Sequence, residues 1–315
     1  MQAGRRCRRH SAGSPVRLAK EMLASSPLHA RIWEGTRRYW QILVPTLFIL
    51  FVFAVPIGQL IVTSFYAYDP LRIVSDRLTI ENYTAILSNS LLWAVISRTI
   101  VLSLLTTLIA GVVAFPVAFR LQQAGKAERF VLVMALLSPI VVSPVVLAYP
   151  WLVLLAPNSG LVPETIRFFG LTPPHLMYSN AGVLIGLVYG ESVFMVLCVH
   201  AALENIPLSL VRASRVLGAT PWQSFRRVIL PLSLPGLASG ALLVFSISTS
   251  SFMMPYLLGG RQVPVLATYA YDMASVLMNW PSAAAVAGIL LTLTGISVGL
   301  FGRWISKLER ELGNV

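Results

Sequence analysis

The sequence predicts an all-α protein of the polytopic membrane class, a helical bundle with about six transmembrane helices. Three observations support this prediction: a very apolar composition, six long apolar segments, and an uneven distribution of basic residues among the loops. Of the 315 residues, 56% are hydrophobic and only 11% are charged, whereas soluble domains carry about 25% charged residues. Because so many apolar residues cannot all be buried in one protein core, we expect the chain to contact lipid.

Six apolar segments are each long enough to cross a hydrocarbon core, which takes about 20 helical residues. Pro139 and Pro144 interrupt the third segment, where the freed backbone carbonyls need a neighbouring helix or a water-filled cavity. Trp and Tyr residues near many segment ends are typical of an aromatic belt. The segments lie near 41–66, 91–119, 130–155, 181–203, 234–258 and 283–305.

The basic residues predict the orientation of these segments. If the N-terminus lies inside, 19 of the 24 Lys and Arg residues fall in inside segments and 5 in outside segments. Because Lys and Arg accumulate in cytoplasmic loops, we expect both termini in the cytoplasm. The outer loops then run near 67–90, 156–180 and 259–282.

The same assignment divides the chain into four regions. Residues 1–40 form a basic cytoplasmic tail that we expect to be disordered at its start. Residues 41–90 hold the first transmembrane helix and an outer loop. The core spans 91–305, with a cytoplasmic loop at 204–233, and residues 306–315 form a cytoplasmic C-terminal tail.

Several classes of function lack their sequence signals. There is no Gly-x-x-x-x-Gly-Lys-Ser/Thr phosphate loop, no His-Glu-x-x-His pattern and no evident Ser-His-Asp arrangement. The two cysteines, Cys7 and Cys198, provide neither a disulfide framework nor metal-ligand spacing. The formal net charge of +12 is scattered between apolar runs, so we expect no nucleic-acid partner. We therefore predict that this chain is not an enzyme and binds no cofactor, ATP or metal itself.

The loop from Leu210 to Pro231 has a well-defined local design. Pro207 is suited to open one short helix, and Gly218 to close it. Thr220, Pro221 and Gln223 are typical of the N-cap, N1 and N3 positions of a second helix, with a capping box. We expect Pro231 and Pro235 to end that second helix.

This loop resembles the cytoplasmic "EAA" loop of the permease subunits of binding-protein-dependent ABC importers. The family pattern is Glu-Ala-Ala, three residues, Gly, then six residues to Phe, two to Ile, and Leu-Pro. The glycine, phenylalanine and Leu-Pro positions match in spacing, but Arg212 stands where the family has glutamate. The corresponding residues here are Arg212, Ala213, Ser214, Gly218, Phe225, Leu230 and Pro231.

The resemblance implies a set of partners and a location. The partners are two cytoplasmic ATPase subunits that bind the ATP, a second permease (identical or different), and an extracytoplasmic solute-binding protein. The location is the bacterial inner membrane. In such a loop the Thr220–Gln223 box, with Pro221, would make a rigid helix, and Trp222 and Phe225 would be apolar anchors in the ATPase groove. Arg226 and Arg227 would pair either with acids there or with anionic lipid.

Polar side chains inside the membrane are candidates for the translocation path. Glu191 is the one acid well inside a predicted span, so it either faces a substrate path or is protonated or paired with a neighbouring helix. A hydroxyl-rich patch in the fifth span either lines the same path or bonds its own helix carbonyls. The candidates in this patch are Ser248, Thr249, Ser250 and Ser251.

Two runs resemble spermidine/putrescine-type permeases within that family: SFMMPYLLGGRQVPVLATYAYD, from Ser251, and NWPSAAAVAGILL, from Asn279. The resemblance implies a polyamine or a related small solute as the transported substrate. The alternative is a secondary transporter or channel that works without an ATPase. Such a protein would show stronger internal symmetry and more intramembrane charge, but no internal repeat is visible and only Glu191 qualifies.

Overall fold

The structure is a computed structural model that describes residues 27–70 and 73–313. The chain divides into two compact units, residues 1–59 and 60–315. The first is dominated by α2 (Pro27–Ser64), whose last turn belongs to the second unit. Every side chain from Ile42 to Ile57 is exposed, as expected of a span that faces lipid or another subunit. The predicted first span, 41–66, is therefore part of a longer helix that includes the last residues of the basic tail, and the predicted disordered start of this tail lies outside the described residues.

The second unit begins with a short β-hairpin that the all-α prediction did not contain. Strands β1 (Tyr66–Asp69) and β2 (Ile73–Leu78) are antiparallel, with Tyr68 opposite Val74 and Tyr66 opposite Leu78. Asn82 fixes the adjacent chain by donating to the carbonyls of Ser64 and Tyr66 at 2.9 and 2.8 Å.

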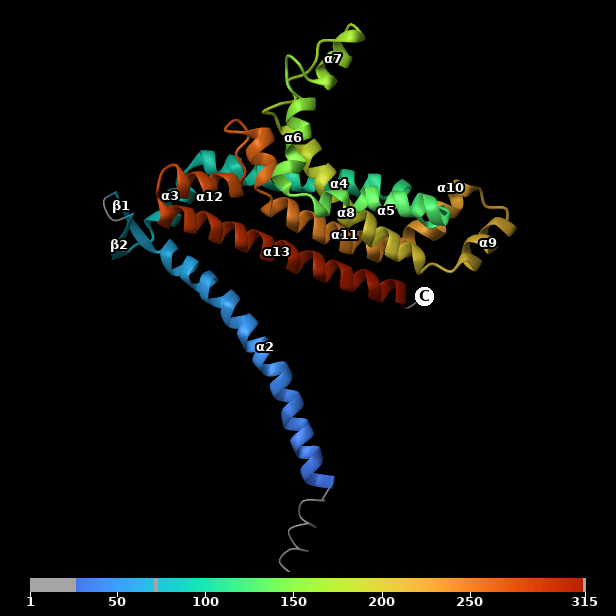
Figure 1. The fold of residues 1–315 in the computed structure, drawn as a ribbon, viewed down its shortest axis with the longest axis horizontal. Coiled ribbons are helices and arrows are strands. Elements are labelled where there is room, and N and C mark those ends of the chain that lie inside the picture. Colours follow the sequence, from blue (N-terminus) through green and yellow to red (C-terminus); the bar gives the residue numbers. More distant parts are fainter. Residues whose placement is uncertain (1–26, 71–72, 314–315) are drawn as a thin grey trace, which may run out of the picture. The chain divides into compact units, whose positions relative to one another are not determined.

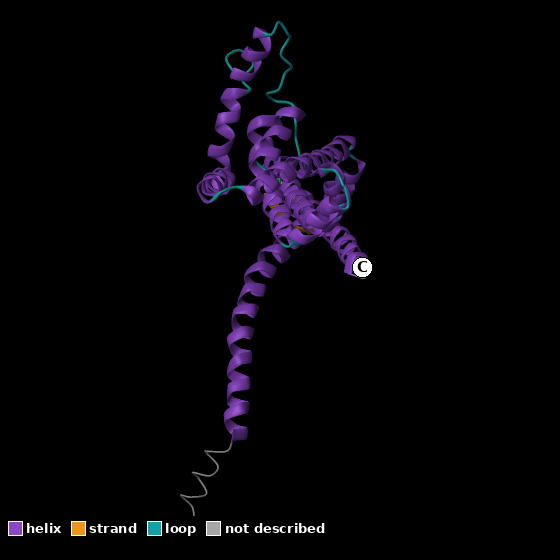
Figure 2. Cartoon of the chain, turned by 90° about the vertical axis from the view of Figure 1, so that its right-hand side faces the viewer, coloured by secondary structure: helices purple, strands orange, loops and turns teal. Residues whose placement is uncertain are grey.

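Helices make up nearly all the rest of this unit (Figure 2). Four long helices, α4, α8, α11 and α13, pack on one another with α11 in contact with the other three (Figure 1). Their bounds and those of the shorter helices are α3 (Glu81–Ser88), α4 (Ser90–Gln123), α5 (Lys126–Val141), α6 (Pro144–Leu154), α7 (Leu161–Phe168), α8 (Asn180–Glu204), α9 (Leu208–Val216), α10 (Pro221–Ser224), α11 (Leu230–Ser250), α12 (Leu266–Ser275) and α13 (Trp280–Gly313). Two π-helical segments, η1 (Phe225–Ile229) and η2 (Pro255–Gly259), complete the order.

Small residues set the distance between the central helices. Ala110, Ala114 and Ala118 form a fully buried row along α4. Gly240 of α11 lies against Met195 of α8, where an added Cβ would come within 2.7 Å of the Met195 sulfur. Such small residues let transmembrane helices approach closely.

Five helices of the described chain are long and apolar enough to cross a membrane, and α5 with α6 would make a sixth if the bent pair is one span. The six predicted segments thus correspond to observed helices. The α5–α6 pair bends by 103° at Val142–Ser143, directly before Pro144. The predicted fifth span, 234–258, differs most: its helix begins near Pro221 and ends at Ser250.

One end of the helical unit gathers the basic residues. The ends of α4, α8 and α13, the start of α5, and the α9–α10 turn lie together there (Figure 1). The hairpin, α3 and α12 lie at the opposite end. We call the first the basic end, since its helices and turn carry Arg120, Lys126, Arg129, Arg212, Arg215, Arg226, Arg227, Arg303 and Lys307.

Candidate functional site

The most defined structure at the basic end is a helical turn from α9 to α10. Pro207 is the N-cap residue of α9, and Gly218 follows its end with φ = 82°. The turn closes with Gly218 N–H donating to the Arg215 carbonyl and Ala219 N–H to the Ser214 carbonyl, both at 3.0 Å. Nothing lies within 4 Å of a Cβ added at Gly218, so backbone conformation alone favours glycine there.

The second helix begins at the predicted capping box. The Gln223 N–H donates to the Thr220 hydroxyl at 3.3 Å, and the Thr220 N–H donates to the Gln223 side-chain oxygen at 2.9 Å. Pro221 occupies the first helical position. These bonds fix the start of the helix, because two backbone donors without intrahelical partners are satisfied by side chains.

The expected stop at Pro231 and Pro235 is wrong. After α10, the chain widens into the π-helical segment η1 and enters α11, which contains both prolines. At the end of η1, the Leu230 N–H donates to the Phe225 carbonyl, five residues earlier. The wider turn gives Pro231, which has no N–H and a bulky ring, a place in a continuing helix. The helical turn is thus joined to a membrane span without an intervening loop.

Two contacts missed by the sequence analysis hold the turn together. The hydroxyls of Ser214 and Ser224 lie 2.8 Å apart and join α9 to α10, with Ser224 only 2% exposed. Phe225 packs edge-on against Phe115 of α4 at 5.5 Å between ring centroids. A serine ten residues from another serine has no sequence signal of its own, so only the folded turn reveals this pair.

The tip of the turn presents exposed apolar side chains. Val216 and Leu217 are 87% and 86% exposed, and Trp222 is 67% exposed while stacking on Phe225. Of the two predicted anchors, Trp222 is therefore open to a partner, whereas Phe225 packs against the core. Ala213 is exposed, and Leu230 and Pro231 are half-buried. The apolar surface of the tip is Val216, Leu217 and Trp222, two of which the sequence analysis did not single out.

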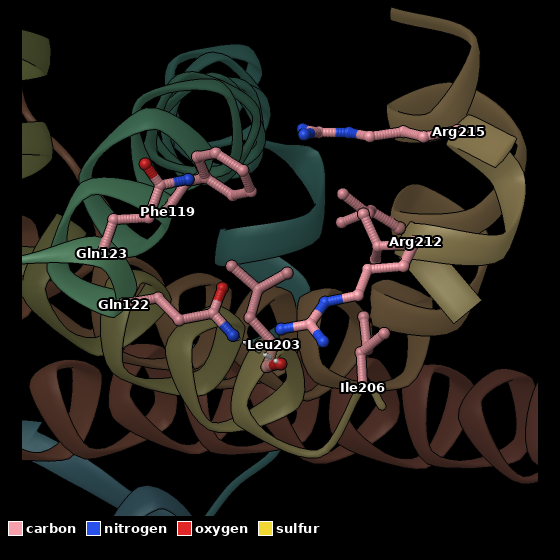
Figure 3. A pocket seen from close by; sticks show the side chains of 9 residues that line it. Phe119, Gln122, Gln123, Leu203, Ile206, Arg212 and Arg215 are labelled. Atoms are coloured by element: carbon pink, nitrogen blue, oxygen red, sulfur yellow. Dashed lines mark hydrogen bonds between the residues drawn. The ribbon is translucent and has the colours of Figure 1, made fainter. Parts of the chain in front are cut away.

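Arg212, the departure from the family pattern, lies away from this tip. It lines a pocket between α9 and the ends of α4 and α8, together with Arg215 of the next helical turn (Figure 3). Both guanidinium groups extend from α9 toward α4, whose Phe119, Gln122 and Gln123 form the facing wall.

An ion-pair cluster joins the other helices at this end. Arg129 of α5 donates to the Glu204 carboxylate at 2.9 Å, and His200 Nε2 lies 3.3 Å from the same carboxylate. Arg120 pairs with Glu128 at 2.5 Å. His200 and Glu204 thus tie α8 to the start of α5 at the basic end.

The candidate path residues occupy two helices that pack together, α8 and α11. Glu191 is 6% exposed and lies beside Ser248, which is 5% exposed. Glu191 Oε2 and the Ser248 hydroxyl have no hydrogen-bond partner among the described residues. In contrast, Thr249 and Ser250 donate to carbonyls of their own helix, Phe245 at 2.7 Å and Ser246 at 3.0 Å. Ser251 is half-buried where α11 ends, so only Glu191 and Ser248 come together as a polar pair.

Among the residues that the structure describes, no group of three or more His, Cys, Asp or Glu side chains is placed to hold a metal ion. The arrangement at the basic end offers a docking surface and a charged pocket. Its distinguishing feature is a capped helical turn that is continuous with a span.

Comparison with known proteins agrees with this architecture. Among curated proteins, the chain is 32% identical over 256 residues to the inner membrane ABC transporter permease protein YdcU of Escherichia coli K12, covering 76% of this chain and 80% of that protein. It is 30% identical to the spermidine/putrescine transport system permease protein PotB of the same organism, covering 84% of this chain and 96% of that protein.

Solved structures share the fold. A chain of a bacterial ABC transporter involved in import of the acidic polysaccharide alginate superposes with a TM-score of 0.73 at 20% identity, covering 88% of this chain and 99% of that one. A chain of the inward-facing MetNI methionine ABC transporter gives 0.53 at 21% identity, covering 69% and 96%.

Residues 116–310, more than half of the chain, match the family described as "Binding-protein-dependent transport system inner membrane component". This segment includes the whole α9–α10 turn and both candidate path helices. The protein is therefore a multi-pass inner-membrane transport component, and it belongs to the binding-protein-dependent transport system family.

Proposed function

We propose that this chain is the permease subunit of an ABC importer that couples a substrate path to cytoplasmic ATPase subunits. The observation that carries the proposal is the continuous helix from Pro221 to Ser250, which joins the exposed tip of the turn directly to a span. The tip, Val216, Leu217 and Trp222, provides an apolar docking surface, since exposed apolar clusters mark interaction sites. A push at this tip would move α11 as one body.

The basic end would lie in the cytoplasm. Nine Lys and Arg residues occur on the turn and helix ends gathered there, as expected of the cytoplasmic side. The C-terminal end of α13 is at this end. Because α2 is followed by the hairpin at the opposite end, a single crossing of the membrane by α2 would place the N-terminal tail on the same side as the basic end. Labelling Leu217→Cys and Phe168→Cys with a membrane-impermeant maleimide tests the orientation. In intact cells we expect the probe to reach position 168, in the outer loop, and not position 217; the reverse pattern would refute it.

The remaining partners follow from the family and its relatives. They are two ATPase subunits, a second permease that is identical or homologous, and an extracytoplasmic solute-binding protein. One relative was solved with a substrate-bound periplasmic protein, which supports the last of these.

The docking role has a direct test. Replacing both Leu217 and Trp222 by Glu should abolish co-purification of the ATPase and ATP-driven uptake, because the docking surface becomes charged. Phe168→Glu is the matched control, since Phe168 is 86% exposed but lies in α7, in the outer loop. Normal ATPase recovery and uptake with the double variant would contradict the docking role.

The proposed substrate is a polyamine or a related small solute. The relatives named for spermidine and putrescine transport support it, as does Glu191, a buried carboxyl that suits a cationic solute. Glu191→Gln should reduce spermidine uptake in vesicles that contain the assembled transporter, whereas the exposed Glu164→Gln should not. Unchanged uptake with Glu191→Gln would remove this residue from the path, and a binding protein that holds another solute class would refute the polyamine assignment.

A further inference from the structure

The pocket that contains Arg212 has the size and composition of a ligand site. Its volume is about 390 Å³, within the range of small-molecule sites. Its polar side chains are Arg212, Arg215, Gln122 and Gln123, and its walls are otherwise apolar (Figure 3). The Gln122 amide is held in place, because its Nε2 donates to the Leu203 carbonyl at 3.1 Å.

The charge in this pocket is uncompensated within the part of the chain that the structure describes. In the described chain, neither the Arg212 side chain nor the Arg215 side chain makes a hydrogen bond or an ion pair with another residue. Two acids of the neighbouring helices, Glu128 of α5 and Glu204 of α8, already pair with Arg120 and Arg129. Two arginines with no acidic partner in a concave site form a position that favours an anion.

A simpler role for the two arginines is to neutralise the carbonyl ends of α4 and α8, since helix C-termini carry partial negative charge. The contacts do not support it. The Leu203 carbonyl accepts from Gln122 and from the Ile206 N–H. Neither guanidinium donates to a carbonyl at these ends in the described structure, so the arginines remain available to a ligand.

An exposed apolar face leads from this pocket along α4. Phe119, which lines the pocket, belongs to a row at helical spacing whose members are all exposed, with Leu108 and Val112 at 64% and 74%. The row consists of Val101, Leu105, Leu108, Val112 and Phe119. A ligand with an anionic head and apolar chains matches both features, since the head would meet the arginines and the chains would lie along the row.

We propose that this pocket binds the phosphate group of an anionic phospholipid of the cytoplasmic leaflet. The proposal rests on the cytoplasmic placement of the basic end given under the proposed function. Arginine suits this role, because its planar guanidinium donates two parallel hydrogen bonds to phosphate oxygens. Arg212 then serves as a lipid ligand at the position where the family pattern has an acid.

The test measures lipids retained by the assembled transporter. The complex is reconstituted in vesicles of equal parts phosphatidylglycerol and phosphatidylcholine, extracted in a mild nonionic detergent, and examined by native mass spectrometry. The variant Arg212→Gln/Arg215→Gln is compared with Arg303→Gln/Lys307→Gln, which removes the same charge from exposed positions of α13 at the basic end. We expect wild type and control to retain phosphatidylglycerol in preference to phosphatidylcholine. The pocket variant should retain roughly tenfold less phosphatidylglycerol than wild type.

The possible outcomes separate the alternatives. Equal loss in both variants would show a diffuse charge effect and overturn the proposal, as would the absence of any preference for phosphatidylglycerol. Displacement of the lipid signal by inorganic phosphate, with phosphate bound in its place, would identify a free-anion site instead. Loss of ATPase recovery by the pocket variant, with lipid retention unchanged, would assign the arginines to a protein partner. Because ATPase recovery is measured in the same samples, failure of the lipid site is distinguishable from failure of the coupling role.

Discussion

The backbone responds to a proline in opposite ways in two regions of the bundle, the α5–α6 junction and the η1–α11 junction. Before Pro144 the helix breaks: Ser143 is extended, with ψ = 138°, and α5 and α6 diverge by 103°. Before Pro231 the helix continues: Leu230 stays helical, with ψ = −49°, and the π-helical turn of η1 precedes it. A proline disfavours a helical residue before it in both cases, so the difference lies in the turn that precedes each proline.

This difference indicates whether each region can transmit a displacement along its helix. A helix interrupted at an extended residue behaves as two bodies, and α6 extends away from the central helices toward α7 (Figure 1). A helix that widens by one residue keeps a hydrogen-bonded backbone through the wider turn, so we expect it to move as one body. The continuous one, from Pro221 to Ser250, starts at the proposed docking tip, which is where mechanical coupling requires it.

The largest expected effect comes from removing one residue of η1. Deleting Arg226 should return this turn to an α-helical ladder, in which the Pro231 ring meets the carbonyl four residues earlier at a cost of about 3 kcal/mol. It would also rotate the tip by about 100° relative to α11. We expect a lower thermal unfolding temperature in detergent and loss of uptake.

Two comparisons make that deletion interpretable. Arg226→Ala removes the charge without changing the residue count, and it should keep both stability and uptake. Combining the deletion with Pro231→Ala should restore stability, because the clash is gone, but not uptake, because the tip stays rotated. Equal stability of the deletion with and without Pro231 would show that η1 does not accommodate the proline.

A smaller effect is expected at Gly218. Gly218→Val should cost about 1–2 kcal/mol, because a side chain is strained at positive φ, and it should abolish uptake while the protein remains in the membrane. Gly218→Asn is the matched control, since asparagine tolerates this conformation. Immunoblots of membrane fractions and uptake assays measure the two effects. Normal uptake with valine would refute the need for this turn geometry.

The cap of the same helix should contribute less. Thr220→Ala removes the hydroxyl that accepts from Gln223 N–H and should cost about 1 kcal/mol. Thr220→Ser keeps an accepting hydroxyl and should unfold at the wild-type temperature. If both variants unfold together, the capping box does not stabilise the turn.

The smallest effect is expected at the broken helix. Pro144→Ala should change stability by about 0.5 kcal/mol or less and leave the bend in place. The reason is that α6 is held by the buried Ala148, which packs in a cluster with Val183 and Leu187 of α8. Electron paramagnetic resonance distances between labels on α5 and α6 measure the bend. A shift to the spacing of a straight helix would show that the proline alone imposes it.

The sequence was most informative where local rules decide the structure. The φ of Gly218, the Thr220–Gln223 capping box and the break before Pro144 each depend on neighbouring residues only. The continuation through Pro231 was not predictable in this way, because a π-helical turn has no composition of its own. The hairpin at Tyr66–Leu78 was missed since its pairing depends on non-local hydrogen bonds.

The polar interior shows a related limit. The sequence located Glu191 and a run of four hydroxyl residues, but it could not say which of them share a helix face with a neighbour. Packing of α8 on α11 brings Ser248 to Glu191 and leaves Thr249 and Ser250 bonded to their own helix. Likewise, Arg212 marked a departure from the family pattern, and only the fold showed that it lines a pocket.

The most direct test of the central claim measures the length and rigidity of the helix from the tip into the span. Spin labels are placed on Arg226→Cys and Leu243→Cys, in a chain whose two native cysteines are replaced by serine, within the assembled transporter. A continuous helix predicts one narrow distance distribution near 25 Å, from a rise of about 1.5 Å per residue, and the same distance with and without ATP. A broad or shortened distribution, or one that changes with ATP, would show a hinge at Pro231 and contradict transmission through a single helix.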